Sequence, residues 1–181
     1  MDGKQLRDGI YALNTRRFGS VAEEMIKRLV SLGKSKNLFH DLYDDVKNHR
    51  VEVKFSVVRK KSMTPIRTET VLQCIEEAVS EHRLVEFESW SDCLFDCNIQ
   101  QIKRAEFEVL YYGLFFSDKV LIFSIRSEEI GSKINYSNKQ HKGNVGEGQF
   151  HINEKKLQVH LDNYLYKTLT YDELCKLLTP D

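Results

Sequence analysis

The chain has 181 residues, of which 41% are hydrophobic and 30% are charged. This length is enough to bury a core within one domain, and the composition excludes a disordered or fibrous protein. Lys and Arg number 27, as do Asp and Glu, so the net charge of zero excludes a general electrostatic attraction to nucleic acid, and any DNA contact must come from a local basic surface.

The amino-terminal part is predicted to hold a helix. Residues 1–10 lack the apolar run of a signal peptide, and no segment reaches the ~20 apolar residues of a membrane span, so we expect a cytoplasmic protein. Apolar residues recur at helical spacing over residues 19–32. Ser20 is suited to cap the start of this helix, and Gly33 is suited to end it.

A β-hairpin is predicted to follow this helix. Segments 38–43 and 50–59 have the composition of extended strands. The polar residues 44–49 between them are typical of a turn.

The remaining chain is predicted to alternate between strands, loops and helices. A second helix is expected over 69–81, and strands are expected over 84–90, 98–103, 107–116 and 119–126. The glycine-rich residues 138–149 predict a loop, and Thr170 with Glu173 forms a capping box for a last helix that ends at Leu178. This order predicts an α/β (mixed α+β) fold, with one mixed sheet flanked by helices in a single domain over 1–181.

The predicted hairpin carries the most informative side chains. Alternation along its second strand places Glu52 and Lys54 on one face and apolar residues on the other. A turn centred between Val46 and Lys47 sets Asp41 opposite Glu52, with Cβ atoms ~4.5–5.5 Å apart. Carboxylates suit Mg²⁺, and an ammonium group can orient water or stabilise charge on a phosphodiester. The alternative is a solvated Glu-Lys pair on an exposed strand.

This pattern resembles the PD-(D/E)XK nuclease superfamily, in particular small type II restriction endonucleases. The resemblance is carried by Asp41 and by the triplet Glu52-Val53-Lys54 in a strand, turn, strand context. It implies a restriction-endonuclease-like central mixed sheet. It also implies that Asp41, Glu52 and the Val53 carbonyl hold Mg²⁺, and that Lys54 is the catalytic lysine.

Two further acidic positions bear on this resemblance. The proline that often precedes the family's first carboxylate is absent, which leaves Asp44 and Asp45 as rivals of Asp41. The first predicted helix also resembles that of the superfamily, in which an acidic residue points toward the metal, and Glu23 is preferred to Glu24 because it lies nearer the apolar stripe. Alternatively, an acidic residue in a first turn simply favours the helix dipole.

Side chains that could contact DNA lie in two segments. Amide, histidine and basic residues on the predicted glycine-rich loop suit contacts to base edges, and a basic run after the second hairpin strand suits phosphate. Each segment is equally consistent with an ordinary solvated surface. These candidates are Gln140, His141, Lys142, Asn144 and Gln149 on the loop, and Arg59, Lys60 and Lys61 in the basic run.

The resemblance predicts a type II restriction endonuclease that hydrolyses phosphodiesters of double-stranded DNA with Mg²⁺. One active site per chain suggests a homodimer for cutting both strands, and a heterodimer is the alternative. The rival functions are a structure-selective or repair nuclease of the same fold, such as a junction resolvase, and a noncatalytic DNA-binding module.

Overall fold

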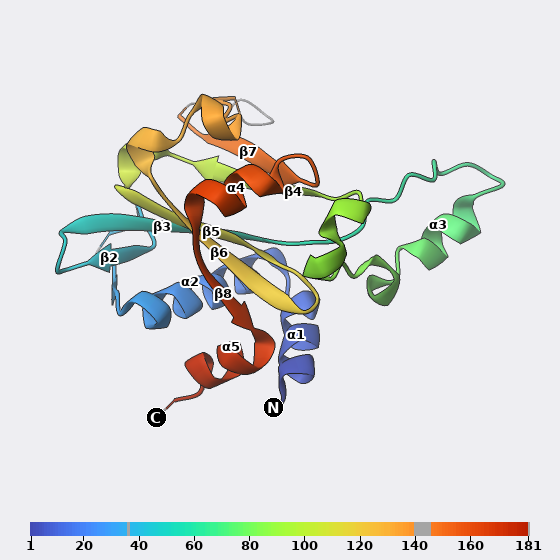
Figure 1. Cartoon of the computed structure of the whole chain (residues 1–181), viewed down its shortest axis with the longest axis horizontal. Helices are drawn as coiled ribbons and strands as arrows, with labels where there is room; N and C mark the ends of the chain where they lie inside the picture. Colours follow the sequence, from blue (N-terminus) through green and yellow to red (C-terminus); the bar gives the residue numbers. More distant parts are fainter. Residues whose placement is uncertain (36, 140–145, 181) are drawn as a thin grey trace.

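The structure is a computed structural model that describes residues 1–35, 37–139 and 146–180 (Figure 1). Its centre is an open six-stranded sheet in which β3 and β5 are parallel and the other neighbours are antiparallel. No helix within these residues is both long enough and apolar enough to cross a membrane. In spatial order the strands are β1 (Gly33–Lys34), β2 (Leu42–Asp44), β3 (His49–Val57), β5 (Val109–Phe115), β6 (Lys119–Arg126) and β8 (Leu165–Thr170).

The middle of the sheet is buried on both faces. Along β5, Leu110, Tyr112 and Leu114 pack into one core, whereas Tyr111 and Phe115 pack into the other. This alternation explains why β5 and β6 are almost continuously apolar. The strands predicted over 107–116 and 119–126 are confirmed, as is the mixed sheet flanked by helices.

Three helices cover the lower face of the sheet as drawn in Figure 1: α1 (Gly3–Ala12), α2 (Thr15–Val30) and α5 (Tyr171–Leu178). The predicted bounds of the first helix were wrong at both ends. The side chain of Asn14, not Ser20, caps α2 by accepting a hydrogen bond from the Arg17 amide. Ser31 ends the helix in the left-handed region, with φ of 58°. The capping box of Thr170 and Glu173 at α5 is confirmed.

A two-stranded ribbon and one helix cover the upper face (Figure 1). The ribbon pairs β4 (Asp96–Ile102) with β7 (Gly148–Asn153) in antiparallel fashion, and α4 (Leu157–Tyr164) lies beside it. The strand predicted over 98–103 is therefore confirmed. The loop predicted over 138–149 was wrong at its end, because β7 begins at Gly148.

Two predicted strands are shorter or absent. Residues 38–41 are not extended, and the strand begins only at Leu42. The segment 84–90 is not a strand: Leu84 forms an isolated bridge with Arg59, and residues 87–90 belong to a 3-10 helix. The described 3-10 helices are Ser80–Arg83, Phe87–Asp92, Arg104–Glu106, Ser127–Glu129 and Ser132–Ile134.

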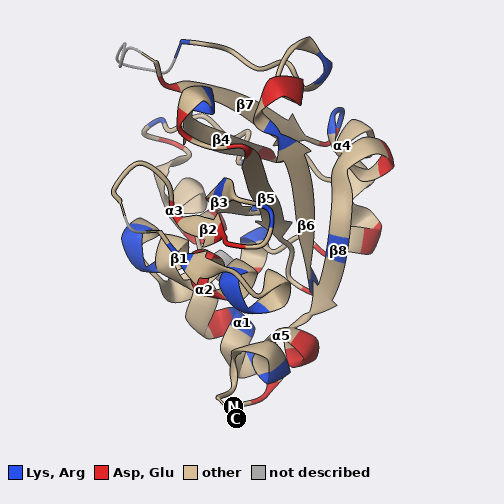
Figure 2. Ribbon diagram, turned by 90° about the vertical axis from the view of Figure 1, so that its left-hand side faces the viewer, with Lys and Arg blue, Asp and Glu red and all other residues tan. Residues whose placement is uncertain are grey.

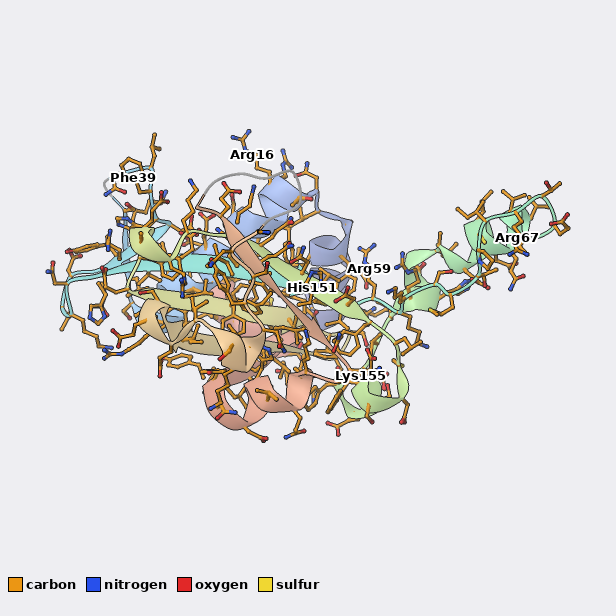
Figure 3. The ribbon with its side chains drawn as sticks, turned by 90° about the horizontal axis from the view of Figure 1, so that it is seen from above. Arg16, Phe39, Arg59, Arg67, His151 and Lys155 are labelled. Carbon is orange, nitrogen blue, oxygen red and sulfur yellow. The ribbon has the colours of Figure 1, made fainter. Side chains whose placement is uncertain are left out.

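An arm projects from the body between β3 and β4, and it carries α3 (Val71–Glu77). This helix is shorter than the predicted 69–81 and buries none of its residues. Arg67 marks the far end of the arm in Figure 3. Leu72 and Ile75 are 78% and 63% exposed, so much of the apolar surface of α3 is uncovered in the described chain.

Acid sensitivity is expected from a histidine in the upper core. His160 is 1% exposed, its Nδ1 lies 2.8 Å from the Tyr112 hydroxyl, and burial, helped by Lys156, lowers its pKa to about 4. Below the ordinary pKa of histidine, the unfolded chain binds a proton that the folded chain excludes, so stability falls as pH falls. We expect His160 to contribute a loss of about 2 kcal/mol between pH 7.5 and pH 5.

Urea unfolding of wild type and His160→Gln at the two pH values measures this contribution. His160→Gln should be less stable than wild type at pH 7.5, and this deficit should shrink by about 2 kcal/mol at pH 5, because groups other than His160 change both proteins alike. His82→Gln, at an exposed position, serves as the control. A deficit of the same size at both pH values would show that His160 does not contribute to the pH dependence of stability.

Candidate metal centre

The register of the β2–β3 hairpin is the one predicted from its turn. Leu42 pairs with Val51 and Asp44 pairs with His49, so the hairpin is centred between residues 46 and 47. Asp41 directly precedes β2, and its amide donates a 3.1 Å hydrogen bond to the Val51 carbonyl. This pairing brings Asp41 beside the segment of β3 that contains Glu52.

On the amino-terminal side of Asp41 the chain is not part of β2. The edge of β3 that follows Val51 therefore has no described strand beside it on this side. The Val53 amide therefore lacks a backbone partner from β2, and the Asp41 carboxylate accepts its hydrogen bond at 2.9 Å. The amide and carbonyl of one strand residue point to the same side of the strand. The Val53 carbonyl thus faces the same open edge as the Asp41 carboxylate.

Lys54 joins the two carboxylates. Its Nζ donates a hydrogen bond to Glu52 Oε1 and lies 3.6 Å from Asp41 Oδ2. The side chains of Lys54 and Asp41 are 25% and 24% exposed and that of Glu52 is 11% exposed, so solvent reaches the cluster from one side. The expected convergence of two carboxylates and one ammonium group is present.

Burial and charge shift the protonation of these groups. Burial, with a smaller contribution from Asp41, raises the pKa of Glu52 to about 7, although the Lys54 ammonium opposes the shift. Burial alone would lower the pKa of Lys54, but Glu52 and Asp41 outweigh it and raise that pKa. Lys54 is therefore a hydrogen-bond donor at neutral pH.

Glu23 approaches the same site from α2. It shares a cavity of about 470 Å³ with Asp41. Burial first, and then the Asp41 carboxylate, raise the pKa of Glu23, whereas Lys54 and Lys34 lower it. Glu24 instead pairs with Arg28 at 2.9 Å. The preference for Glu23 over Glu24 agrees with this geometry.

The residues present fit a hard divalent cation. One Asp41 carboxylate oxygen bonds to the Val53 amide, which leaves the other oxygen available to a metal. The Glu52 carboxylate is buried, and the Val53 carbonyl faces the open edge. All three ligand atoms are therefore oxygens, which Mg²⁺ prefers. No group of three His, Cys, Asp or Glu side chains in residues 1–35, 37–139 and 146–180 is arranged to hold a metal. Two carboxylates meet here, and the Lys54 ammonium lies between them.

The rival carboxylates occupy the turn. Asp44 Oδ1 accepts hydrogen bonds from the amides of Val46 and Lys47 at 3.1 and 3.0 Å, which commits it to the turn. Its partner across the hairpin is His49, three residues before Glu52, a separation of roughly 10 Å along a strand. Asp45 lies in the turn beyond it. These positions favour Asp41.

The predicted DNA contacts are dispersed. Arg59 follows the end of β3 and donates a 3.1 Å hydrogen bond to the Tyr11 carbonyl of α1. Lys60 and Lys61 lie at the base of the arm. Gln149 is on β7 rather than on a loop. The other four candidates lie outside the described residues: Gln140, His141, Lys142 and Asn144.

One cation near the site was not predicted. Lys34, on the two-residue strand β1, lines the cavity that contains Glu23 and Asp41. A strand this short has no alternating pattern, so the sequence offered no signal for it. In Figure 2 basic and acidic residues are interspersed along α2 and near β1 and β2, as expected for a chain of zero net charge.

Comparisons with family models, curated proteins and solved structures find no match to this chain. The case for a function therefore depends on the side-chain geometry and on the sequence pattern.

Proposed function

We propose that this protein is a Mg²⁺-dependent nuclease of the PD-(D/E)XK type that hydrolyses phosphodiesters of double-stranded DNA, and specifically a type II restriction endonuclease. One observation carries the proposal: Asp41, Glu52 and Lys54 converge where β3 continues beyond the end of β2. The pattern of these residues in the sequence supports the same family.

The residues have separable roles in this proposal. Asp41, Glu52 and the Val53 carbonyl would hold Mg²⁺, which supplies an activated water and neutralises charge on the phosphate. Lys54, charged and held by Glu52, donates to the attacking water or to a phosphate oxygen in the transition state. Glu23 orients water from the other side of the cavity.

Cleavage of unmethylated phage DNA with Mg²⁺ tests the proposal directly. Discrete fragments whose sequenced ends share a motif would support a restriction endonuclease. Cleavage restricted to branched DNA would instead favour a junction resolvase. Intact DNA in every buffer, with Mg²⁺, Mn²⁺ or neither, would overturn the nuclease proposal and favour a DNA-binding module.

A homodimer is part of the proposal, because one chain offers one candidate centre and a duplex has two strands to cut.

The arm supplies an unpartnered surface for a second copy. A seven-residue helix is marginal in water unless its apolar face packs on something. Leu72 and Ile75 lie on one side of α3 and Val79 follows its end, and these side chains are 78%, 63% and 45% exposed.

Light scattering tests this arrangement. Wild type should have twice the 21.2 kDa mass of one chain, and Ile75→Asp should have the mass of a monomer, because a charge cannot be buried at such a contact. Gln73→Asp, on the other side of the same helix, should stay dimeric. A monomeric wild type would contradict the homodimer, and a mass that doubles only when a second protein is added would indicate a heterodimer.

A further inference from the structure

The outer face of the β4–β7 ribbon is unusually polar. Cys97 and Ile99 of β4 and Phe150 and Ile152 of β7 enter the upper core, and β4 carries a bulge between Gln100 and Ile102. The opposite face turns to solvent, and four of its six side chains are amides. These six residues are Asp96, Asn98 and Gln100 on β4, and Gln149, His151 and Asn153 on β7.

Strand stability does not explain this composition. Asp and Asn are depleted in strands, yet Asp96, Asn98 and Asn153 occupy half of these outer positions. Exposed strand faces are better served by Thr or by aromatic residues. Neither a lysine nor an arginine lies on either strand, so the face is also not a phosphate-binding surface.

The amides of the ribbon are held in place by hydrogen bonds to one another and to backbone. Asn98 Nδ2 donates to Gln149 Oε1 at 2.8 Å, and Gln149 Nε2 donates to the Lys139 carbonyl at 3.4 Å. His151 Nδ1 lies 2.9 Å from Asp96 Oδ1. Asn98 Nδ2 also donates to Gln100 Oε1 at 3.5 Å, and Asn98 Oδ1 is buried without a partner in the part of the chain that the structure describes. Each amide has two donors and two acceptor positions, so Gln149 retains a donor and an acceptor, whereas both donors of Asn98 are engaged within the ribbon.

The ribbon lies on the side of the sheet that carries the candidate metal centre. Val51 and Val53 face the lower core, so Glu52 and Lys54 face upward, toward the ribbon. Figure 3 shows β7 and His151 crossing above the main sheet.

A cavity lies between the ribbon, the end of β3 and the α1–α2 segment, and it does not include Asp41, Glu52 or Lys54. Asn98 and Gln100 line this cavity of about 290 Å³, whose wall includes Ser56 and Arg59 of the β3 segment. Ser56 is two residues beyond Lys54, a distance of about 7 Å along a strand. This distance corresponds to roughly two base-pair steps of duplex DNA. A duplex placed with its phosphate at Lys54 would bring nearby base pairs to the ribbon.

We propose that the outer face of the β4–β7 ribbon enters the major groove and recognises adenine in A·T base pairs close to the cleavage site. A two-stranded ribbon fits a groove about 12 Å wide, and Asn or Gln amides bond to adenine N6 and N7 together. Gln149 makes these contacts, with Gln100 beside it, and Asn98 holds the Gln149 side chain in place through its hydrogen bond to Oε1. This inference rests on the proposed nuclease function and assigns the base-reading surface of that enzyme.

The test uses the full chain, Mg²⁺ and a library of randomised duplexes. Sequenced ends of wild-type products should contain at least one A·T pair within a few base pairs of the cut. Asn98→Ala and Gln149→Ala should lower the cleavage rate at that site about 10- to 100-fold and relax the preference at the A·T position. Gln158→Ala removes an exposed amide from α4 and should cleave like wild type.

A chemical probe separates base reading from a structural effect. Replacing the adenine by 7-deazaadenine removes the N7 acceptor, and it should slow wild type about as much as Gln149→Ala does, with no further loss in the variant. If wild type cuts but the variants and the 7-deaza duplex behave normally, the ribbon does not read bases and the nuclease proposal stands. If wild type neither cuts nor binds any duplex, both proposals fail.

Discussion

Replacing Lys54 by methionine is expected to slow DNA cleavage about 100- to 1000-fold while Mg²⁺ binding is retained. Methionine keeps an apolar stem in the half-buried position but removes the ammonium that donates to Glu52. Without that charge the two carboxylates repel each other, so the metal-free variant should be less stable than wild type by about 1–3 kcal/mol at pH 8. Mg²⁺ replaces the missing positive charge, so it should raise the melting temperature more in the variant than in wild type.

Two measurements distinguish a catalytic lysine from a structural one. Single-turnover cleavage reports the chemistry, and thermal unfolding with and without Mg²⁺ reports metal binding. Lys47→Met changes a lysine in the turn of the same hairpin, 65% exposed, and should leave both unchanged. A Lys54→Met variant that cuts at the wild-type rate would overturn the assignment of Lys54 as the catalytic lysine. One that also lost its response to Mg²⁺ would indicate a structural role.

The hairpin that builds the candidate centre was predictable because its signals are local. Period-two alternation on β3 and a polar turn determine the register, and a register fixed by a turn places every side chain on a known face. Asp41 opposite Glu52 follows from these two features alone. The hydrogen bond from the Val53 amide to Asp41 was not predictable, because it requires the chain to leave the sheet before Leu42.

Other elements depend on contacts between distant residues. The segment 84–90 has strand-like composition, yet the Phe87 amide donates to Asp118 Oδ1 at 2.7 Å, and the segment forms short helices instead. The ribbon pairs Asn98 with His151, more than fifty residues apart, so its polar face is assembled only in the fold. Helix α1 was missed although Asp2 and Gln5 form a capping box at its start.

Gly113→Ala is expected to destabilise the protein by more than about 3 kcal/mol and to yield mostly insoluble chain. Gly113 lies in β5, where an added Cβ would be 2.1 Å from the Leu121 carbonyl oxygen and 2.4 Å from the Phe55 ring. The first of these atoms is backbone of the neighbouring strand, so it cannot rotate away. The methyl group must therefore push β6 or β3 out of the sheet.

This position links the stability of the sheet to the candidate centre, because Gly113 pairs with Phe55, the residue after Lys54. Any soluble Gly113→Ala should therefore lose Mg²⁺-dependent stabilisation along with global stability. Gly19→Ala is the matched control: its Cβ would meet nothing within 4 Å on α2, and alanine should add roughly 0.5–1 kcal/mol in a helix. Urea unfolding measures both changes. A Gly113→Ala variant as stable as wild type would mean that β3, β5 and β6 do not pack this closely. The position of Lys54 on β3 would then also be wrong.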